Sequence, residues 1–124
     1  MHKKGHSNIA TGRLGEEIAV EFLKRNGITI IGNNLRTPYG EIDVLGQEGD
    51  CLVFCEVKTR RNNQFGFPEN SVNLVKQEHI VQAAIAYLQE KDELDRSWRI
   101  DVIAVNLFRS KPPKIEWFKN AING

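Results

Sequence analysis

The chain has 124 residues, a net charge of +1 and 27% charged residues. This length fits a single domain, which we expect to span residues 1–124 with residues 1–7 flexible. The near-neutral charge excludes a protein that binds nucleic acid through a strongly basic overall field, so any such contact must come from a local basic patch. No apolar run approaches membrane-spanning length and no signal peptide is apparent, so we expect a cytoplasmic protein without a membrane partner.

The two cysteines and three histidines do not support a disulfide bond or a zinc site. Cys51 and Cys55 lie four positions apart on one predicted strand. Their Cα atoms would be about 13 Å apart, which is too far for a disulfide bond. With no further cysteine, a zinc site is unsupported as well.

In chain order, hydrophobic periodicity and turn residues predict two helices and five strands. The first helix runs to Asn26, capped by Ser7 or Asn8, and Gly27 ends it. A short strand over 28–31, a polar crossing over 33–39 and a hairpin over 41–48 and 51–59 follow. A loop with Phe65 and Phe67 precedes a second helix from Asn73 to Gln89, and strands over 98–105 and 114–118 complete an α/β fold with an αβββαβ core.

The predicted hairpin brings two carboxylates together. Gly49-Asp50 suits a two-residue turn, and counting back from Glu48 opposite Cys51 places Asp43 opposite Glu56 and Glu41 opposite Lys58. Two carboxylates that close repel each other unless they share a proton or bind a cation. A plain ion pair between Glu56 and Lys58 is the alternative, but the apolar neighbours indicate a buried central strand, which favours the cation site.

Other residues are candidates for the same site. A helical wheel turns Glu16, rather than Glu17, towards the edge of the core. Gly12 and Gly15 either let another backbone approach closely or mark a frayed helix start. Gln77 lies within the apolar stripe of the second helix, where it would bond to a backbone group or act near a phosphate or metal-bound water.

Basic residues near the hairpin are candidates for nucleic-acid contact. They are Arg36, Arg60, Arg61 and Lys76. Phe65 and Phe67 would either stack on bases or pack against the domain. Asp101, beside Arg99, is interpreted as half of a structural ion pair.

Four segments follow one another along the chain: Gly12-Arg13-Leu14-Gly15-Glu16, Gly40-Glu41-Ile42-Asp43, the run from Phe54 to Arg60, and Lys76-Gln77. In this order they resemble the YraN-type family of small bacterial predicted endonucleases. That family belongs to the PD-(D/E)xK, or restriction-endonuclease-like, superfamily and is similar to archaeal Holliday-junction resolvases. Ile42 stands where the superfamily name has proline, but that proline supplies no ligand atom.

The resemblance implies a function and a set of roles. Asp43, Glu56 and the Val57 carbonyl would bind Mg²⁺ (or Mn²⁺), Lys58 would orient or deprotonate the attacking water, and Glu16 would complete the metal shell. The implied activity is metal-dependent hydrolysis of DNA, on branched or damaged substrates, by a homodimer. The alternatives are a nucleic-acid-binding module of this fold that does not cut, and a protein-interaction domain.

Overall fold

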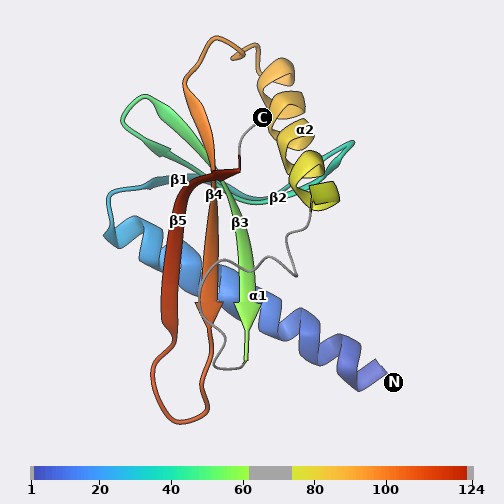
Figure 1. The fold of residues 1–124 in the computed structure, drawn as a ribbon, viewed down its shortest axis with the longest axis vertical. Helices are drawn as coiled ribbons and strands as arrows, with labels where there is room; N and C mark the ends of the chain where they lie inside the picture. The colour runs from blue at the N-terminus through green and yellow to red at the C-terminus, as the bar shows by residue number, and fades with distance from the viewer. Residues whose placement is uncertain (1, 62–73, 123–124) are drawn as a thin grey trace.

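The computed structural model describes the backbone of residues 2–61 and 74–122, and their side chains from residue 10 onward. The elements follow in the order α1 (His2–Arg25), β1 (Thr29–Thr37), β2 (Gly40–Glu48), β3 (Cys51–Arg60), α2 (Leu74–Glu90), β4 (Trp98–Asn106) and β5 (Lys114–Ile122) (Figure 1). This order confirms the predicted α/β class and αβββαβ core, to which β5 adds a further strand.

The strands form one mixed sheet in the order β1-β2-β3-β4-β5, so neighbours in the chain are neighbours in the sheet. The β3 and β4 strands are parallel, and the other adjacent pairs are antiparallel. A parallel pair needs a long crossover, and α2 lies on that connection. The β3 strand is therefore the centre of the sheet, which explains its nearly unbroken apolar sequence.

The two helices cover opposite faces of the sheet (Figure 1). On one face, Leu23 of α1 packs in the same apolar cluster as Val53. On the other face, Leu88 of α2 packs with Phe54 and Ile100. Because side chains of a strand alternate between faces, β3 contributes to both cores at once.

The first strand is longer than the sequence predicts. Residues 33–37, expected as a polar crossing, continue β1 and pair with β2 as far as Thr37 and Gly40. The polar residues mislead because β1 is an edge strand, where Asn33 and Asn34 remain exposed. A register shift between Ile30 and Gly32 also interrupts the alternation on which strand prediction depends. The last strand likewise continues beyond residue 118, to Ile122.

The observed ends of the helices agree only in part with the ends predicted from the sequence. Gly27, with φ of 90°, lies in the turn that follows α1, as expected of a left-handed stop residue. The predicted caps Ser7 and Asn8 are wrong, because α1 begins at His2. A formed helix gains one backbone hydrogen bond for each residue added, so it can extend beyond a candidate cap.

Some predictions concern residues outside the described ranges. They are the cap at Asn73 and the aromatic residues Phe65 and Phe67. Within the described ranges, both cysteines are free, as predicted. No helix there has the length and apolar character needed to cross a membrane.

Candidate functional site

The predicted hairpin register is correct along the paired part of β2 and β3. The ladder begins with Glu48 opposite Cys51 and ends with Val44 opposite Cys55. The same register aligns Asp43 with Glu56, but backbone pairing stops there, and Asp43 Oδ2 instead accepts a hydrogen bond of 2.9 Å from the Val57 N–H. The ladder does not continue to Glu41 and Lys58, whose predicted pairing is not formed.

The sheet is distorted where Asp43 lies. Ile42 and Val44 are two positions apart, yet they pack in the cores on opposite faces, so the alternation of side chains breaks between them. Across the neighbouring strand, Asn34 falls at the register position of Asp43 and has a φ of 50°. Asparagine tolerates this left-handed conformation better than most residues. The distortion turns the Asp43 carboxylate towards β3.

Asp43 and Glu56 form a carboxyl pair with shifted pKa values. Burial is the largest cause of the shift at Asp43, the negative charge of Glu56 adds to it, and together they raise the pKa of Asp43 to about 8. Burial also raises the pKa of Glu56, and the two carboxyl groups share a hydrogen bond. Without a cation, the pair therefore retains a proton at neutral pH.

Lys58 lies beside this pair. Its Nζ atom is 3.5 Å from Glu56 Oε2, and the two side chains are 21% and 16% exposed. The Glu56–Lys58 ion pair considered from the sequence therefore forms. It leaves Asp43 with a backbone N–H as its donor, so the positive charge offsets the repulsion within the carboxyl pair only in part.

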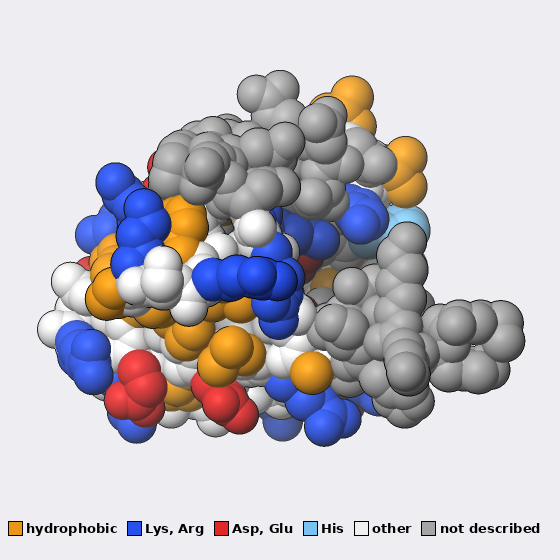
Figure 2. All heavy atoms as spheres, turned by 90° about the horizontal axis from the view of Figure 1, so that it is seen from below, with side chains coloured by type: hydrophobic (Ala, Val, Ile, Leu, Met, Phe, Trp, Pro, Cys, Tyr) orange, Lys and Arg blue, Asp and Glu red, His pale blue; other side chains and the backbone are white. Residues whose placement is uncertain are grey.

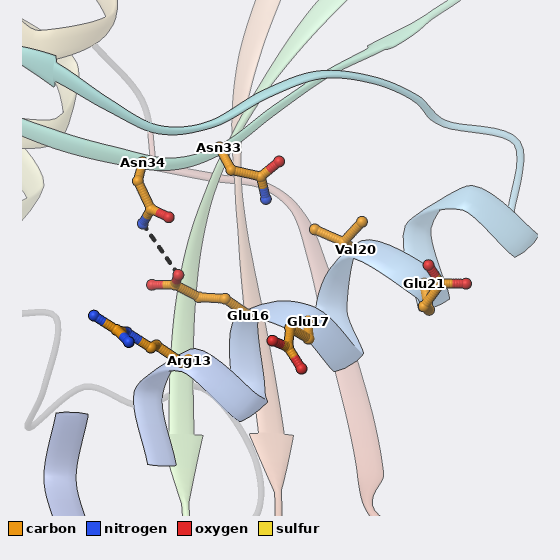
Figure 3. Close-up of a pocket in the computed structure, with 7 residues that line it drawn as sticks. All are labelled: Arg13, Glu16, Glu17, Val20, Glu21, Asn33 and Asn34. Carbon is orange, nitrogen blue, oxygen red and sulfur yellow. Dashed lines mark hydrogen bonds between the residues drawn. The ribbon is translucent and has the colours of Figure 1, made fainter. Parts of the chain in front are cut away.

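Glu16 approaches from α1 at the edge of the pair. It is half-buried whereas Glu17 is exposed, as the helical wheel predicts. Its charge contributes to the raised pKa of Asp43. The Asn34 side chain donates from Nδ2 to Glu16 Oε1 at 3.0 Å (Figure 3) and to Glu41 Oε1 at 3.1 Å. One amide group thus links two carboxylates from different elements.

Glu16 and Asn34 also line a cavity of about 730 Å³. Figure 3 shows their side chains pointing towards each other, one from α1 and one from β1. Glu17 and Glu21 also line this cavity, from the helix side. Sequence reasoning did not find Asn34, which falls in the segment expected as a polar crossing, although asparagine is a residue type suited to a positive φ.

Gly15 explains how α1 lies so close to β3. It is buried, and a Cβ atom there would overlap the side chain of Thr59. A Cβ at Gly12 would meet nothing. At Gly15 a neighbouring element does approach closely, but the contact is with the Thr59 side chain rather than with another backbone. Neither glycine marks a frayed helix start, because α1 begins at His2. The contact fixes the helix turn that carries Glu16 against the strand that carries Glu56.

A second, smaller cavity opens on the α2 side of the pair. Its volume is about 170 Å³, and Glu41 and Glu56 line it together with Lys76 and His79 of α2. The charge of Lys76 lowers the pKa of Glu56, in opposition to burial. Gln77, on the same turn, is half-buried and does not line this cavity.

The predicted nucleic-acid contacts have different environments. Arg36 and Arg61 are exposed. Arg60 is 11% exposed and donates to Asn106 Oδ1 at 3.0 Å and to Glu116 Oε1 at 3.1 Å. These bonds tie the end of β3 to β4 and β5, which is a structural role.

The residues expected to bind a metal gather only in part. Asp43 and Glu56 are adjacent, and the Val57 N–H is bonded to Asp43. Within the described ranges, no three His, Cys, Asp or Glu side chains form a group that could hold a metal ion. Glu16 acts on Asp43 through its charge, while its carboxylate is bonded to Asn34.

Comparison with known proteins identifies the family. The model of the uncharacterised protein family UPF0102 matches residues 15–105. A UPF0102 protein of Dehalococcoides mccartyi is 42% identical over 112 residues, covering 90% of this chain and 92% of the relative. A UPF0102 protein of Geobacter sulfurreducens is 41% identical over 116 residues, covering 94% and 91%.

These matches extend over nearly the whole chain, including the segments that carry Glu16, Asp43, Glu56 and Lys58. They confirm the resemblance noted in the sequence motifs. The chain therefore belongs to the UPF0102, or YraN, family.

Proposed function

We propose that the chain is a metal-dependent endonuclease that hydrolyses DNA phosphodiester bonds, with branched or damaged DNA as the expected substrate. The observation that carries this proposal is the Asp43–Glu56 carboxyl pair, which lies beside Lys58 Nζ at 3.5 Å from Glu56. Perturbed carboxyl groups that share a proton, with an amine next to them and a cavity that Glu56 lines, are typical of a catalytic centre.

The donor set fits Mg²⁺ or Mn²⁺. Mg²⁺ prefers oxygen ligands, keeps several of its waters and is commonly held by one or two carboxylates. Asp43 and Glu56 would hold it, with the Val57 carbonyl as a third ligand. Two protein carboxylates satisfy such an ion, so the absence of a third one from the cluster within the described ranges is compatible with it.

The chain's own residues then have distinct roles. When bound, Mg²⁺ polarises the scissile phosphate and lowers the pKa of a water molecule. Lys58 orients that water, and its positive charge offsets the charge that develops on the phosphate oxygens. Glu16, at the edge of the pair, would hold a further water, and Gln77 would donate a hydrogen bond to the phosphate or to a bound water.

A cleavage assay with purified protein and Mn²⁺ tests the proposal. The substrates are linear, single-stranded, flapped and four-way DNA. We expect Glu56→Gln to reduce cleavage by about 100-fold or more, because it removes a ligand charge from the reacting centre. Glu90→Gln is the matched control, since this glutamate is exposed at the end of α2.

Two outcomes would contradict the proposal. Cleavage that persists in Glu56→Gln would come from a contaminating nuclease. No cleavage of any substrate by the unaltered chain, together with retained DNA binding, would favour the non-cleaving binding module instead.

A further inference from the structure

The end of the sheet where β3 and β4 finish contains a second basic feature, separate from the carboxyl pair. Because the two strands are parallel, their last residues, Arg60 and Asn106, lie side by side. The Leu107 N–H donates to the Arg60 carbonyl at 2.7 Å, which extends the pairing by one bond. The residues that follow each strand are therefore neighbours, although they are far apart in the sequence.

These residues line a cavity of about 380 Å³. Its walls are Arg61 after β3, and Leu107, Phe108 and Arg109 after β4. The Nζ atom of Lys111 lies 4.5 Å from the centre of the Phe108 ring, so a third cation is close to the same place. We call this group of Arg61, Phe108, Arg109 and Lys111 the strand-end cleft.

Among the residues that the structure describes, no acidic side chain forms an ion pair with a cation of the strand-end cleft. Arg61 donates from Nε and Nη2 to the hydroxyl of Thr11, at 3.1 and 2.9 Å, and a hydroxyl orients a guanidinium without cancelling its charge. Within the described ranges, no salt bridge involves Arg61, Arg109 or Lys111. By contrast, Arg60, Arg96 and Arg99 all pair with carboxylates there.

Figure 2 looks at this end of the molecule and shows more lysine and arginine than acidic side chains on the visible face. The chain as a whole carries a net charge of only +1, so this excess is a local property. Arginine binds phosphate groups through paired N–H donors, and an adjacent aromatic ring offers a stacking surface. These are the features of a surface for a polyanion with bases.

We propose that the strand-end cleft binds the phosphodiester backbone of DNA next to the reacting phosphate. The position of that phosphate rests on the proposed function, whereas the binding itself does not. Arg61 follows Lys58 by three residues, or about 10 Å at the rise of a strand.

DNA binding without catalysis tests this proposal. Fluorescence anisotropy would measure the affinity of the full chain carrying Asp43→Asn for labelled linear and four-way DNA, in EDTA, over a range of salt concentrations. We expect Arg61→Gln/Arg109→Gln to raise the dissociation constant at least tenfold. The slope of log affinity against log salt should become shallower by about 2, because two phosphate contacts are lost.

The control variant also removes two positive charges, but outside the strand-end cleft. Arg25→Gln/Lys91→Gln alters two exposed cations, at the end of α1 and just after α2, and it should leave the affinity within about twofold of the parent and the slope unchanged. Thermal denaturation of each variant checks that the fold is retained.

The results separate the two proposals. An unchanged slope in Arg61→Gln/Arg109→Gln, or an equal loss in the control, would overturn the strand-end cleft even if the unaltered chain cuts DNA. The expected loss of binding supports the cleft even if no substrate is cut, in which case only the nuclease proposal fails.

Discussion

Asp101 on β4 and Asp43 on β2 are both acidic residues inside the same sheet, but they have very different partners. Asp101 is fully buried and accepts hydrogen bonds from two nitrogens of Arg99, from Trp117 Nε1 and from the Asn120 N–H, at 2.8–3.2 Å. Asp43 accepts one bond from the Val57 N–H and faces the carboxyl groups of Glu56 and Glu16.

This difference shows that the fold needs the charge at Asp101 for stability, whereas it tolerates the charge at Asp43 at a cost. A fully bonded buried carboxylate belongs to the structure, as was predicted for the Arg99–Asp101 pair. A carboxylate that faces other carboxylates destabilises the folded chain unless a proton or a cation is bound. The difference in bonding partners between the two aspartates supports placing the proposed cation at Asp43.

The largest expected effect on stability comes from removing the charge of Asp101, the fully bonded aspartate. Asp101→Asn should lower the free energy of unfolding by about 3 kcal/mol, because it removes the charge that Arg99 pairs with in the interior. Urea denaturation at pH 7 would measure this. A loss below about 1 kcal/mol would mean that the bond of Arg99 to Glu48 is sufficient on its own, and the contrast between the two aspartates would weaken.

At Asp43, removing the carboxylate charge is expected to stabilise the folded chain rather than to destabilise it. The pKa of Asp43 is about 8 in the folded chain and near 3.8 for an unperturbed aspartate, so the folded state keeps a proton that the unfolded state has lost between these pH values. The stability of the metal-free protein should therefore fall as pH rises from about 4 to 8.

Asp43→Asn should make this profile flatter and raise the free energy of unfolding at pH 8.5 by about 2 kcal/mol. Urea denaturation in EDTA at pH 5 and pH 8.5 would compare the variant with the unaltered chain. A variant that is less stable at both pH values would show that the Val57 bond outweighs the repulsion.

The smallest expected effect concerns the amide between Glu16 and Glu41. Asn34→Gly removes both side-chain bonds but relieves a positive φ, so stability should change by no more than about 0.5 kcal/mol. Without the amide, Glu16 loses its fixed position, and the affinity for Mn²⁺ measured by calorimetry should fall severalfold.

Asn120→Gly is the matched control for this variant. Asn120 has the same φ of 50°, and glycine keeps the backbone N–H that bonds to Asp101. It should leave the affinity for Mn²⁺ unchanged. An equal decrease in both variants would point to a general effect on the sheet rather than a role of Asn34.

The sequence predicts those parts of the site that depend on local spacing. Gly49 and the alternating runs beside it are enough to align Glu48 with Cys51, because a two-residue turn fixes the register of a hairpin. The helical wheel selects Glu16 over Glu17 for the same reason, since the period of a helix is also local.

Contacts between distant segments could not be predicted in this way. Arg60 was expected at a nucleic-acid surface, but its partners Asn106 and Glu116 are 46 and 56 positions away. Asn34 was missed because its role depends on carboxylates from α1 and β2 meeting at one amide. The strand-end cleft has the same origin, since the parallel pairing of β3 and β4 brings its two halves together.

The agreement between strand order and chain order has a consequence for folding. Asp43 and Val57 are 14 positions apart, whereas Arg60 and Asn106 are 46 apart. Closing the shorter loop costs less entropy, so the hairpin can form before β4 and α2 are in place. We therefore expect the acidic pair to assemble in a nascent hairpin still open to water, where ions have access before the surrounding walls close.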